Sequence, residues 1–292
     1  MDERKESEYL KNYDITKYER PSVAADIAIF TVMEDRNANY RKLAVKKLKM
    51  LLIKRGVPPF EGLWALPGGF VRKGETIEDA AYRELREETG VNQSYLKEIG
   101  VFSQPGRDPR GWIISDAFMA LTDASHLKVR GSDDAKEAAW FNVTLESIDG
   151  EKQSEQSHLS AEHRYKLCLT SEDVRLCAIL SEKVQMEDYH KKSEIAIIES
   201  NGLAFDHAKI ILSSIRQLRH LTEEGNMAFD LLPEYFTLTD LQNVYEIILD
   251  KELLKANFRR KIMHLVLPTE QMVEGAGHRP AQLFFRNLEN FF

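Results

Sequence analysis

GFVRKGETIEDAAYRELREETGV, residues 69–91, is the stretch of this 292-residue sequence that decides the fold. Its second half predicts a helix over residues 76–89. Thr76 is a favourable N-cap residue and has Asp79 three positions later. Gly90 favours an end to the helix, because glycine readily adopts the left-handed conformation found there.

Three carboxylates fall on one face of this helix. Glu84, Glu87 and Glu88 are spaced i, i+3 and i+4. Like charges at that spacing repel one another, so the arrangement is unfavourable unless a cation lies among them. Hard oxygen ligands in this number suit Mg²⁺, which shares its other positions with water and phosphate. Three acids at this spacing could also form a solvated acidic helix face. The full set of residues over 69–91 argues against that alternative.

The residues around these acids complete the pattern. Arg83 and Glu75 can pair and tie the preceding loop to the helix. Gly68 and Gly69 allow the backbone to approach a metal or a phosphate closely. A row of apolar side chains at intervals of four can pack on a sheet: Ile77, Ala81 and Leu85.

The whole stretch resembles the signature of the Nudix hydrolases, GX5EX7REUXEEXGU with U aliphatic. Every fixed position is met: Gly69, Glu75, Arg83, Glu84, Leu85, Glu87, Glu88, Gly90 and Val91. The resemblance implies an α+β fold, an α/β/α sandwich built on a mixed sheet. It also implies hydrolysis of a nucleoside diphosphate linked to another group.

The same resemblance assigns roles to residues. Mg²⁺ or Mn²⁺ is expected on Glu84, Glu87 and Glu88, together with the carbonyl of Gly69, and these acids form the expected catalytic set with Arg83. Bound metal lowers the pKa of the attacking water and spreads the developing charge. The general base stays open between Glu84 and acids before Trp140, which are Asp133, Asp134 and Glu137.

A second segment bears on the substrate. Arg107 and Arg110 flank an Asp-Pro pair in SQPGRDPRGWIIS, residues 103–115. Arginine can bind phosphate through two parallel hydrogen bonds, so both side chains are candidate substrate ligands together with Gly68 and Gly69. A surface turn with an Asp–Arg pair is the alternative.

Apolar runs rich in Val, Ile and Phe predict the strands of the sheet. They occupy residues 22–33, 48–55, 112–121 and 138–143, with a further strand before the Pro-Gly-Gly loop at residues 67–69. A polar stretch at 34–42 predicts a turn or a long hairpin loop.

Residues 144–199 predict an elaboration of this first domain, which we place at residues 1–201. Residues 146–162 are polar and predict a loop or a weak helix. Alternating apolar and polar residues at 164–171 and 173–184 predict a hairpin, and residues 194–200 predict another strand.

The second domain, residues 202–292, predicts a winged helix-turn-helix. Three helical segments at residues 204–221, 238–249 and 255–266 precede two apolar segments with Gly275 and Gly277 between them. Three helices followed by a β-hairpin are the plan of that fold.

The third helical segment is basic, although the domain is not. Residues 201–292 carry ten Lys and Arg against twelve Asp and Glu, a balance of −2. A recognition helix enters the major groove with basic and amide side chains facing phosphates and bases. The candidate DNA-binding residues are Lys255, Asn257, Arg259, Arg260 and Lys261, with Arg279 in the hairpin tip. A winged helix that only dimerises is the alternative.

The two halves together resemble one family, the Nudix-related transcriptional regulators of NAD metabolism. The similarity covers about residues 22–143 and 202–292 and includes WALPGGFV, LAFDHAKII and LLPEYFTLTDLQNVYEIIL. It implies that the Nudix domain senses ADP-ribose or a related nucleotide, and that a homodimer binds double-stranded DNA. Many members of that family have a degraded Nudix box, whereas the box here is intact.

Composition limits the remaining possibilities. The net charge of −7 restricts any nucleic-acid site to a local basic patch. No apolar run approaches the ~20 residues of a membrane helix, and the polar N-terminus lacks the apolar core of a signal peptide, so we expect a cytoplasmic protein. Reduced thiols are then the simplest expectation for Cys168 and Cys177, with a local disulfide as the alternative.

Two functions of different classes therefore remain. One is an ADP-ribose pyrophosphatase whose winged helix is structural, and the other is a DNA-binding regulator whose Nudix domain is a ligand sensor. The intact box favours catalysis, the basic helix favours regulation, and the two are not exclusive.

Overall fold

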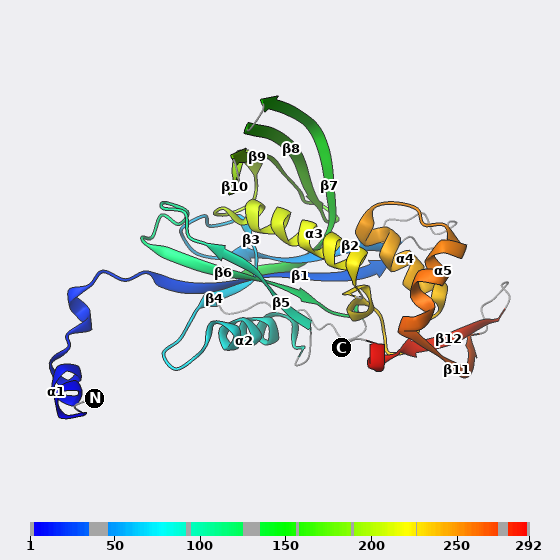
Figure 1. The fold of residues 1–292 in the computed structure, drawn as a ribbon, viewed down its shortest axis with the longest axis horizontal. Helices are drawn as coiled ribbons and strands as arrows, with labels where there is room; N and C mark the ends of the chain where they lie inside the picture. The colour runs from blue at the N-terminus through cyan, green and yellow to red at the C-terminus, as the bar shows by residue number, and fades with distance from the viewer. Residues whose placement is uncertain are drawn as a thin grey trace.

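A ten-stranded mixed sheet forms the centre of the part of the chain that the structure describes (Figure 1). The computed structural model describes residues 3–34, 46–91, 95–124, 135–155, 158–187, 190–225, 227–273 and 280–290. The sheet contains β1 (Ser22–Glu34), β2 (Lys46–Arg55), β3 (Trp64–Ala65), β4 (Gly68–Phe70), β5 (Tyr95–Phe102), β6 (Ile113–Leu121), β7 (Ala135–Glu155), β8 (His158–Thr170), β9 (Arg175–Glu187) and β10 (His190–Asn201).

The strand order is β10-β9-β8-β7-β2-β1-β6-β5, with β3 added beside β2 and β4 beside β1. β1 and β6 run parallel, and the other pairs are antiparallel. The predicted mixed sheet is therefore confirmed, as are the predicted strands within it. The polar stretch at 34–42 lies outside the described residues except for Glu34, the last residue of β1.

One helix covers each face of the sheet. α2 (Ile77–Thr89) lies below the sheet and α3 (His207–Glu224) lies above it (Figure 1). β1 is buried on both faces, which explains why its sequence is almost continuously apolar. Ala25, Ile27 and Ile29 belong to the core under α2, whereas Ala28 and Phe30 belong to the core under α3.

The local signals around α2 are confirmed. Thr76 and Asp79 form a complete capping box, and Gly90 ends the helix in the left-handed conformation at φ 70°. Ala81 and Leu85 are buried against the sheet, and Ile77 packs at the edge of the same core.

The elaboration consists of four antiparallel strands, β7 to β10, which curve upward beside α3 (Figure 1). The expected hairpin and strand are confirmed, but the loop or weak helix expected at 146–162 is wrong. There β7 continues to Glu155 and β8 begins at His158, and the two strands pair from Asp149–Arg164 to Glu155–His158 beyond a register shift at Ser147/Asp149. The antiparallel ladder is made of backbone hydrogen bonds, which form with polar side chains as well as with apolar ones.

Cys168 and Cys177 form a disulfide, so the expectation of reduced thiols is wrong for this structure. The register of β8 and β9 places the two residues directly opposite one another, with their Cα atoms 4.3 Å apart. Sequence separation alone did not reveal that pairing.

The C-terminal part has the predicted winged-helix plan. α4 (Leu238–Leu249) and α5 (Lys255–Ile262) are followed by the hairpin of β11 (Val266–Val273) and β12 (Ala281–Arg286). α3 contacts both the sheet and α4, so the expected domain boundary after residue 201 stays a prediction.

The remaining helical segments are short. α1 (Glu3–Asn12) lies at the end of an arm that projects from the sheet (Figure 1), and sequence patterns did not predict it. Turns of 3-10 helix lie at Ile15–Lys17, Met227–Leu231, Met263–Leu265 and Leu288–Asn290. No helix in the described ranges is both long and apolar enough to cross a membrane.

Gly202, between β10 and α3, offers a test of this packing. Its φ is +86°, and a Cβ there would lie 2.5 Å from Cδ2 of Leu176, a buried side chain. We expect Gly202→Ala to lower the free energy of unfolding by about 2–4 kcal/mol, through backbone strain and overpacking together.

Gly62→Ala is the matched control, because Gly62 has a φ of +81° but nothing within 4 Å of the point where its Cβ would lie. It should show the backbone strain alone, about 1 kcal/mol. Urea unfolding of both variants measures the difference, and equal losses would show that Leu176 does not restrict this position.

Candidate active site

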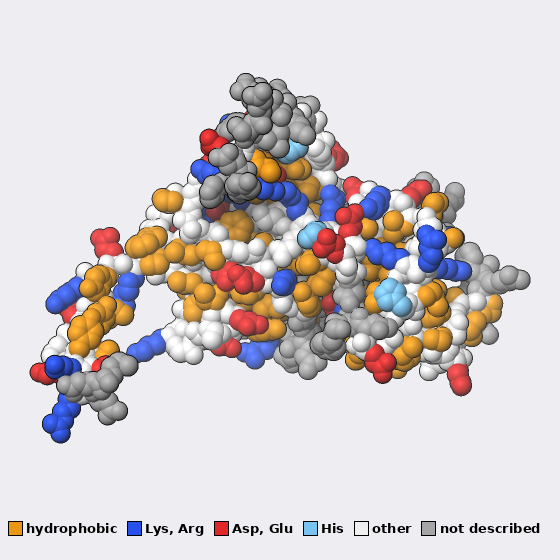
Figure 2. All heavy atoms as spheres, in the orientation of Figure 1, with side chains coloured by type: hydrophobic (Ala, Val, Ile, Leu, Met, Phe, Trp, Pro, Cys, Tyr) orange, Lys and Arg blue, Asp and Glu red, His pale blue; other side chains and the backbone are white. Residues whose placement is uncertain are grey.

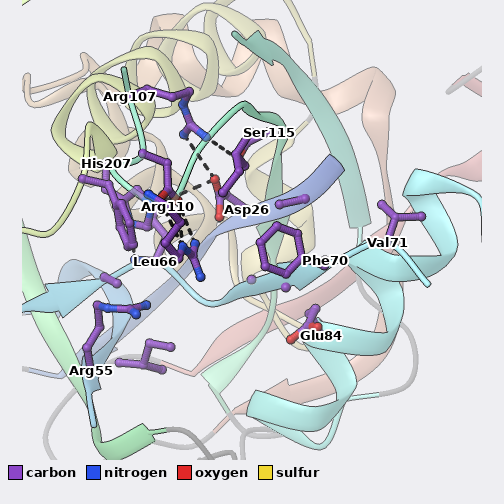
Figure 3. A pocket seen from close by; sticks show the side chains of 18 of the residues that line it. Asp26, Arg55, Leu66, Phe70, Val71, Glu84, Arg107, Arg110, Ser115 and His207 are labelled. Carbon is purple, nitrogen blue, oxygen red and sulfur yellow. Dashed lines mark hydrogen bonds and ion pairs between the residues drawn. The ribbon is translucent and has the colours of Figure 1, made fainter. Parts of the chain in front are cut away.

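A cavity of about 540 Å³ opens where the Nudix-like loop, α2 and the start of α3 meet (Figure 3). Glu84 lies at one end of it, and Arg107 and His207 lie at the other. Cavities of this size hold nucleotide-sized ligands in other proteins. These residues are far apart in the sequence, and the fold brings them to one cavity.

Gly68 and Gly69 are required by close packing. β4 pairs with β1 so that Gly69 faces Ala25 and Gly68 faces Asp26. A Cβ on Gly68 would lie 2.5 Å from the carbonyl oxygen of Ala25, and a Cβ on Gly69 would overlap the carboxylate of Glu84. The backbone at Gly68 and Gly69 thus lies close to Ala25 and Glu84 as well as to the cavity, as expected for glycine at these positions.

The box acids differ in their environment. Glu84 and Glu87 line the cavity, and the Glu87 side chain is 42% exposed. Glu88 is 1% exposed and lies on the buried side of α2. Burial raises the pKa of Glu84, and the neighbouring Arg83 opposes that shift.

Arg83 is the cation that the acids share in this structure. Its guanidinium donates to Glu84 at 2.5 Å and lies 3.7 Å from Glu87. It also donates to both carboxylate oxygens of Glu75, at 2.8 and 3.2 Å, which confirms the expected pair. These hydrogen bonds hold the pKa of Glu75 at about 2.

The donor set fits a divalent cation in its chemistry. Carboxylates on adjacent turns face a cavity, and Gly69 carries no Cβ between its backbone and Glu84. In the described residues, no three acidic, histidine or cysteine side chains already converge as metal ligands. Arg83 occupies the space between Glu84 and Glu87, so a cation has to compete with it.

The general base candidates separate by position. Glu84 lies in the cavity, whereas Glu137 is exposed on β7 and pairs with Lys54 at 3.4 Å. Asp133 and Asp134 lie outside the described residues. Of the two candidates that the structure describes, Glu84 is the one that lines the cavity, and the identity of the base stays a prediction.

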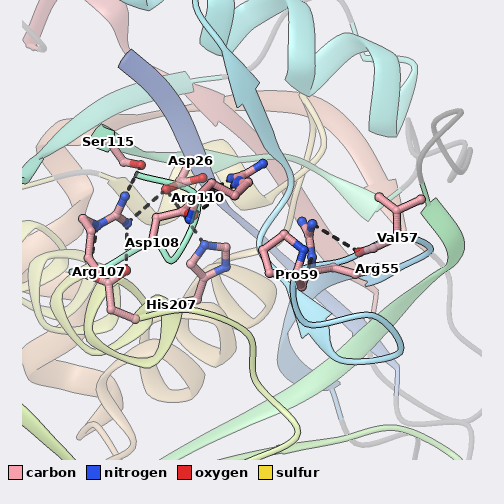
Figure 4. Close-up of polar contacts among 10 residues, drawn as sticks. Asp26, Arg55, Val57, Pro59, Arg107, Asp108, Arg110, Ser115 and His207 are labelled. Carbon is pink, nitrogen blue, oxygen red and sulfur yellow. Dashed lines mark hydrogen bonds and ion pairs between the residues drawn. The ribbon is translucent and has the colours of Figure 1, made fainter. Parts of the chain in front are cut away.

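Arg107 is buried, with 5% of its side chain exposed. It donates to both carboxylate oxygens of Asp206, at 2.7 and 3.1 Å, and to the hydroxyl of Ser115 at 2.6 Å. Asp26 lies 3.6 Å from the same guanidinium (Figure 4). The expected role of Arg107 as a phosphate ligand stays a prediction. A phosphate that binds here would have to replace Asp206, which already accepts two hydrogen bonds from the guanidinium.

Arg110 is more accessible, with 42% of its side chain exposed. Asp108 accepts from it at 2.7 Å, which is the pair expected of an Asp–Arg surface turn. Its guanidinium also lies 5.1 Å from the ring centre of Phe70 and 5.4 Å from that of Phe205. Arg55 lies 4.9 Å from the same Phe205 ring, so cations flank this aromatic side chain.

His207 closes the inner wall of the cavity, and sequence patterns did not single it out. Its Nδ1 accepts a hydrogen bond of 2.9 Å from the backbone N–H of Leu66. Burial lowers the pKa of His207, while the nearby Asp26 and Asp206 oppose that shift. The side chain is thus a neutral imidazole that joins α3 to the loop before Gly68.

Further hydrogen bonds attach the start of α3 to the loop that carries the glycines. The N–H of Trp64 donates to the carbonyl of Gly202 at 2.9 Å, and the N–H of Ala204 donates to the carbonyl of Trp64 at 2.8 Å. The cavity and the beginning of α3 are consequently one hydrogen-bonded unit.

The candidate DNA-binding residues lie on or near α5. Lys255, Asn257, Arg259, Arg260 and Lys261 are exposed. Figure 2 shows Lys and Arg side chains gathered over the part of the surface formed by α4 and α5. Lys261 donates to the carbonyl of Glu223 at 2.5 Å, so it points back to α3, and Arg279 lies outside the described residues.

Comparisons with known proteins agree with this architecture. Residues 37–161 match the family model described as the NUDIX domain, and residues 228–285 match the NrtR DNA-binding winged helix domain. The ADPR responsive transcriptional repressor NtrR of Acinetobacter baylyi is 30% identical over 290 residues, which cover 98% of this chain and 90% of that protein. An ADP-ribose pyrophosphatase of Methanocaldococcus jannaschii is 42% identical over 137 residues, which cover 46% of this chain and 71% of that protein.

Solved structures share the fold across both domains. A MutT/nudix family protein from Enterococcus faecalis is 25% identical with a TM-score of 0.64, over 98% of this chain and 99% of that one. NrtR of Shewanella oneidensis, solved with a 27mer DNA, is 24% identical with a TM-score of 0.59, over 91% and 93% of the two chains. This chain therefore belongs to the family of regulators that join a Nudix domain to an NrtR-type winged helix domain.

Proposed function

We propose that this protein binds and hydrolyses ADP-ribose in the cavity, and that its winged helix binds DNA in a manner controlled by that nucleotide. The observation that carries the proposal is the position of the cavity. An intact Nudix box forms one end, and the first turn of α3, which leads to the winged helix, forms the other. The relatives named for ADP-ribose response and for ADP-ribose hydrolysis support both halves of the proposal.

The catalytic end uses the box acids. Glu84, Glu87, Glu88 and the carbonyl of Gly69 would hold Mg²⁺ or Mn²⁺, which would lower the pKa of a bound water and offset the charge of the diphosphate. Glu75 retains Arg83 when the acids bind the cation, because its two hydrogen bonds to that guanidinium are independent of Glu84. Glu84 serves as the base that accepts the proton of the attacking water, and the products are AMP and ribose 5-phosphate.

The binding end uses cations and an aromatic ring. Arg110 and Arg107 supply positive charge for the phosphates. Phe205, between Arg55 and Arg110, offers an apolar face for the base or a ribose. The glycines at 68 and 69 allow the diphosphate to approach the backbone.

The regulatory end is α5. We place the protein in solution as a homodimer whose two α5 helices contact successive major grooves of a two-fold symmetric site. The chain has a net charge of −7, so its attraction to DNA depends on the exposed basic residues of α5. Contacts between basic residues and phosphates weaken as salt increases, so affinity for DNA should fall steeply with salt.

Loss of charge in the box tests the catalytic proposal. We expect Glu87→Gln to lower turnover of ADP-ribose by orders of magnitude, because Glu87 lines the cavity and the substitution removes a charge at the proposed metal site. Glu78→Gln is the matched control, since Glu78 is exposed on the first turn of the same helix and does not line the cavity. Release of AMP with Mg²⁺ or Mn²⁺ is the measurement.

Two outcomes of that assay would contradict the catalytic proposal. Wild-type protein that leaves every nucleoside diphosphate conjugate intact would show that the catalytic half of the proposal is wrong. Equal activity in Glu87→Gln and Glu78→Gln would remove Glu87 from the site.

Truncation of two side chains on α5 tests the DNA proposal. We expect Arg259→Ala and Arg260→Ala each to weaken binding to the operator by about 1–3 kcal/mol if they contact bases. Lys183→Ala removes the same charge from an exposed position on β9 and should leave binding within ~0.5 kcal/mol of wild type. A titration of labelled operator measures all three, and wild-type affinity in the Arg259/Arg260 double variant would exclude this helix from the interface.

A further inference from the structure

We propose that Asp206 is a switch residue. In the nucleotide-free protein it holds Arg107, and when the nucleotide is bound it releases Arg107 to the ligand's phosphates and caps α3 instead. This inference rests on the proposed function, because it describes how occupation of the cavity reaches the winged helix.

The first observation is the strength of the existing pair. The Asp206 carboxylate accepts two hydrogen bonds from Arg107, and both side chains are almost completely buried, with 10% and 5% exposed. This two-point geometry is the one that arginine uses for a phosphate. Asp206 is therefore an internal anion that occupies Arg107, and Arg107 lines the cavity that an anionic ligand enters.

The second observation is a helix cap that is not made. Asp206 is the N-cap residue of α3, but its side chain makes no capping hydrogen bond. The N-cap residues of the other long helices beside the site and in the winged helix, Thr76 and Thr237, both form complete capping boxes. Aspartate is among the best N-cap residues, so its carboxylate has a second use that the Arg107 pair prevents.

The Asp206 carboxylate can bind Arg107 or cap α3, but it cannot do both at once, and in both cases it accepts hydrogen bonds from N–H groups. A carboxylate released from Arg107 stays next to the positive end of the α3 dipole, where backbone N–H groups can donate hydrogen bonds to it. The phosphates of the ligand then replace Asp206 on Arg107. Arg107 keeps an anionic partner in both states, and Asp206 exchanges a charged partner for the positive end of the helix dipole, so the two states are close enough in free energy for a ligand to select between them.

The other end of α3 holds the helix-turn-helix. Arg219 donates to the carbonyl of Ile248 at 3.1 Å, and Glu223 pairs with Lys251 at 2.6 Å. α3 has 18 residues and so spans ~27 Å. A change in how its first turn is held is thus transmitted by a rigid element to α4 and α5.

The ligand and DNA consequently favour different states. DNA binds the state in which Arg107 fixes the start of α3, and the nucleotide binds the state in which Arg107 is available. A ligand shifts such an equilibrium only by its differential affinity, and here that difference is the Arg107–phosphate contact.

Asp206→Asn tests the switch, because asparagine caps helices well but carries no charge to hold Arg107. The assays are ADP-ribose affinity without DNA, operator affinity without nucleotide, and operator affinity at saturating ADP-ribose, all with Ca²⁺ to prevent turnover. For wild type we expect ADP-ribose to weaken operator binding by ~5–150-fold. For Asp206→Asn we expect tighter ADP-ribose binding, weaker operator binding without nucleotide, and less than a ~2-fold effect of the nucleotide.

Lys209→Ala is the matched control. Lys209 lies on the same first turn of α3 and donates to Gln104 of the Arg107 loop at 2.8 Å, so it is another contact between the same two elements. It has no part in the switch and should retain the wild-type effect of ADP-ribose. An equal loss of the effect in Lys209→Ala would overturn the switch, because any loosening of this junction would then suffice.

Hydrogen exchange of the wild-type protein supplies a second readout that does not depend on a variant. ADP-ribose should slow exchange of the backbone amide of residue 208, because the released carboxylate caps it, whereas the amide of Lys209 already donates to the carbonyl of Asp206 at 2.8 Å. Unchanged or faster exchange there, or an Asp206→Asn variant that melts like wild type and retains the full effect of ADP-ribose, would overturn the switch. Asp206→Ser, also a good cap, replaces Asn if that variant does not fold. If ADP-ribose binds wild-type protein without changing its operator affinity, the sensor half of the proposed function fails instead.

Discussion

Repulsion among the carboxylates of α2 is the constraint on which the site depends. Glu84 and Glu87 face the same cavity, and their coexistence requires a positive charge. Arg83 supplies it here while Glu75 fixes Arg83 in place from the loop. Because Glu75 binds the same arginine independently of Glu84, Arg83 would stay paired if the acids bound a metal ion as proposed above.

Local patterns were sufficient wherever the physics is local. The caps of α2, its apolar row and the pairing of Glu75 with Arg83 all lie within about sixteen residues, and the structure confirms each of them. The polar β7–β8 ladder was misread because its strands are stabilised by pairing with one another, which no local apolar pattern reports. The disulfide was only the alternative to reduced thiols for the same reason, since the strand register brings Cys168 opposite Cys177.

The candidate site shows the same division. The box residues were predictable from their spacing, whereas Asp26, Asp206 and His207 enter from segments far away in the sequence. Arg107 was predicted as a ligand for phosphate on its chemistry alone. The fold gives that guanidinium a carboxylate 99 residues away, a partner that only tertiary structure can supply.

Both domains are packed as one body around α3. A continuous apolar cluster runs from Phe30 of the sheet, through Ile211 and Leu218 of α3, to Tyr245 and Phe258 of the helix-turn-helix. A helix packed on both sides cannot move at one end without a change at the other, because packed interiors are nearly incompressible. The box acids lie at one end of the cavity and the first turn of α3 lies at the other. Under the proposed function, the bond that is hydrolysed lies among the carboxylates and the charge that controls DNA binding lies at Arg107, so hydrolysis and regulation use different parts of one bound nucleotide.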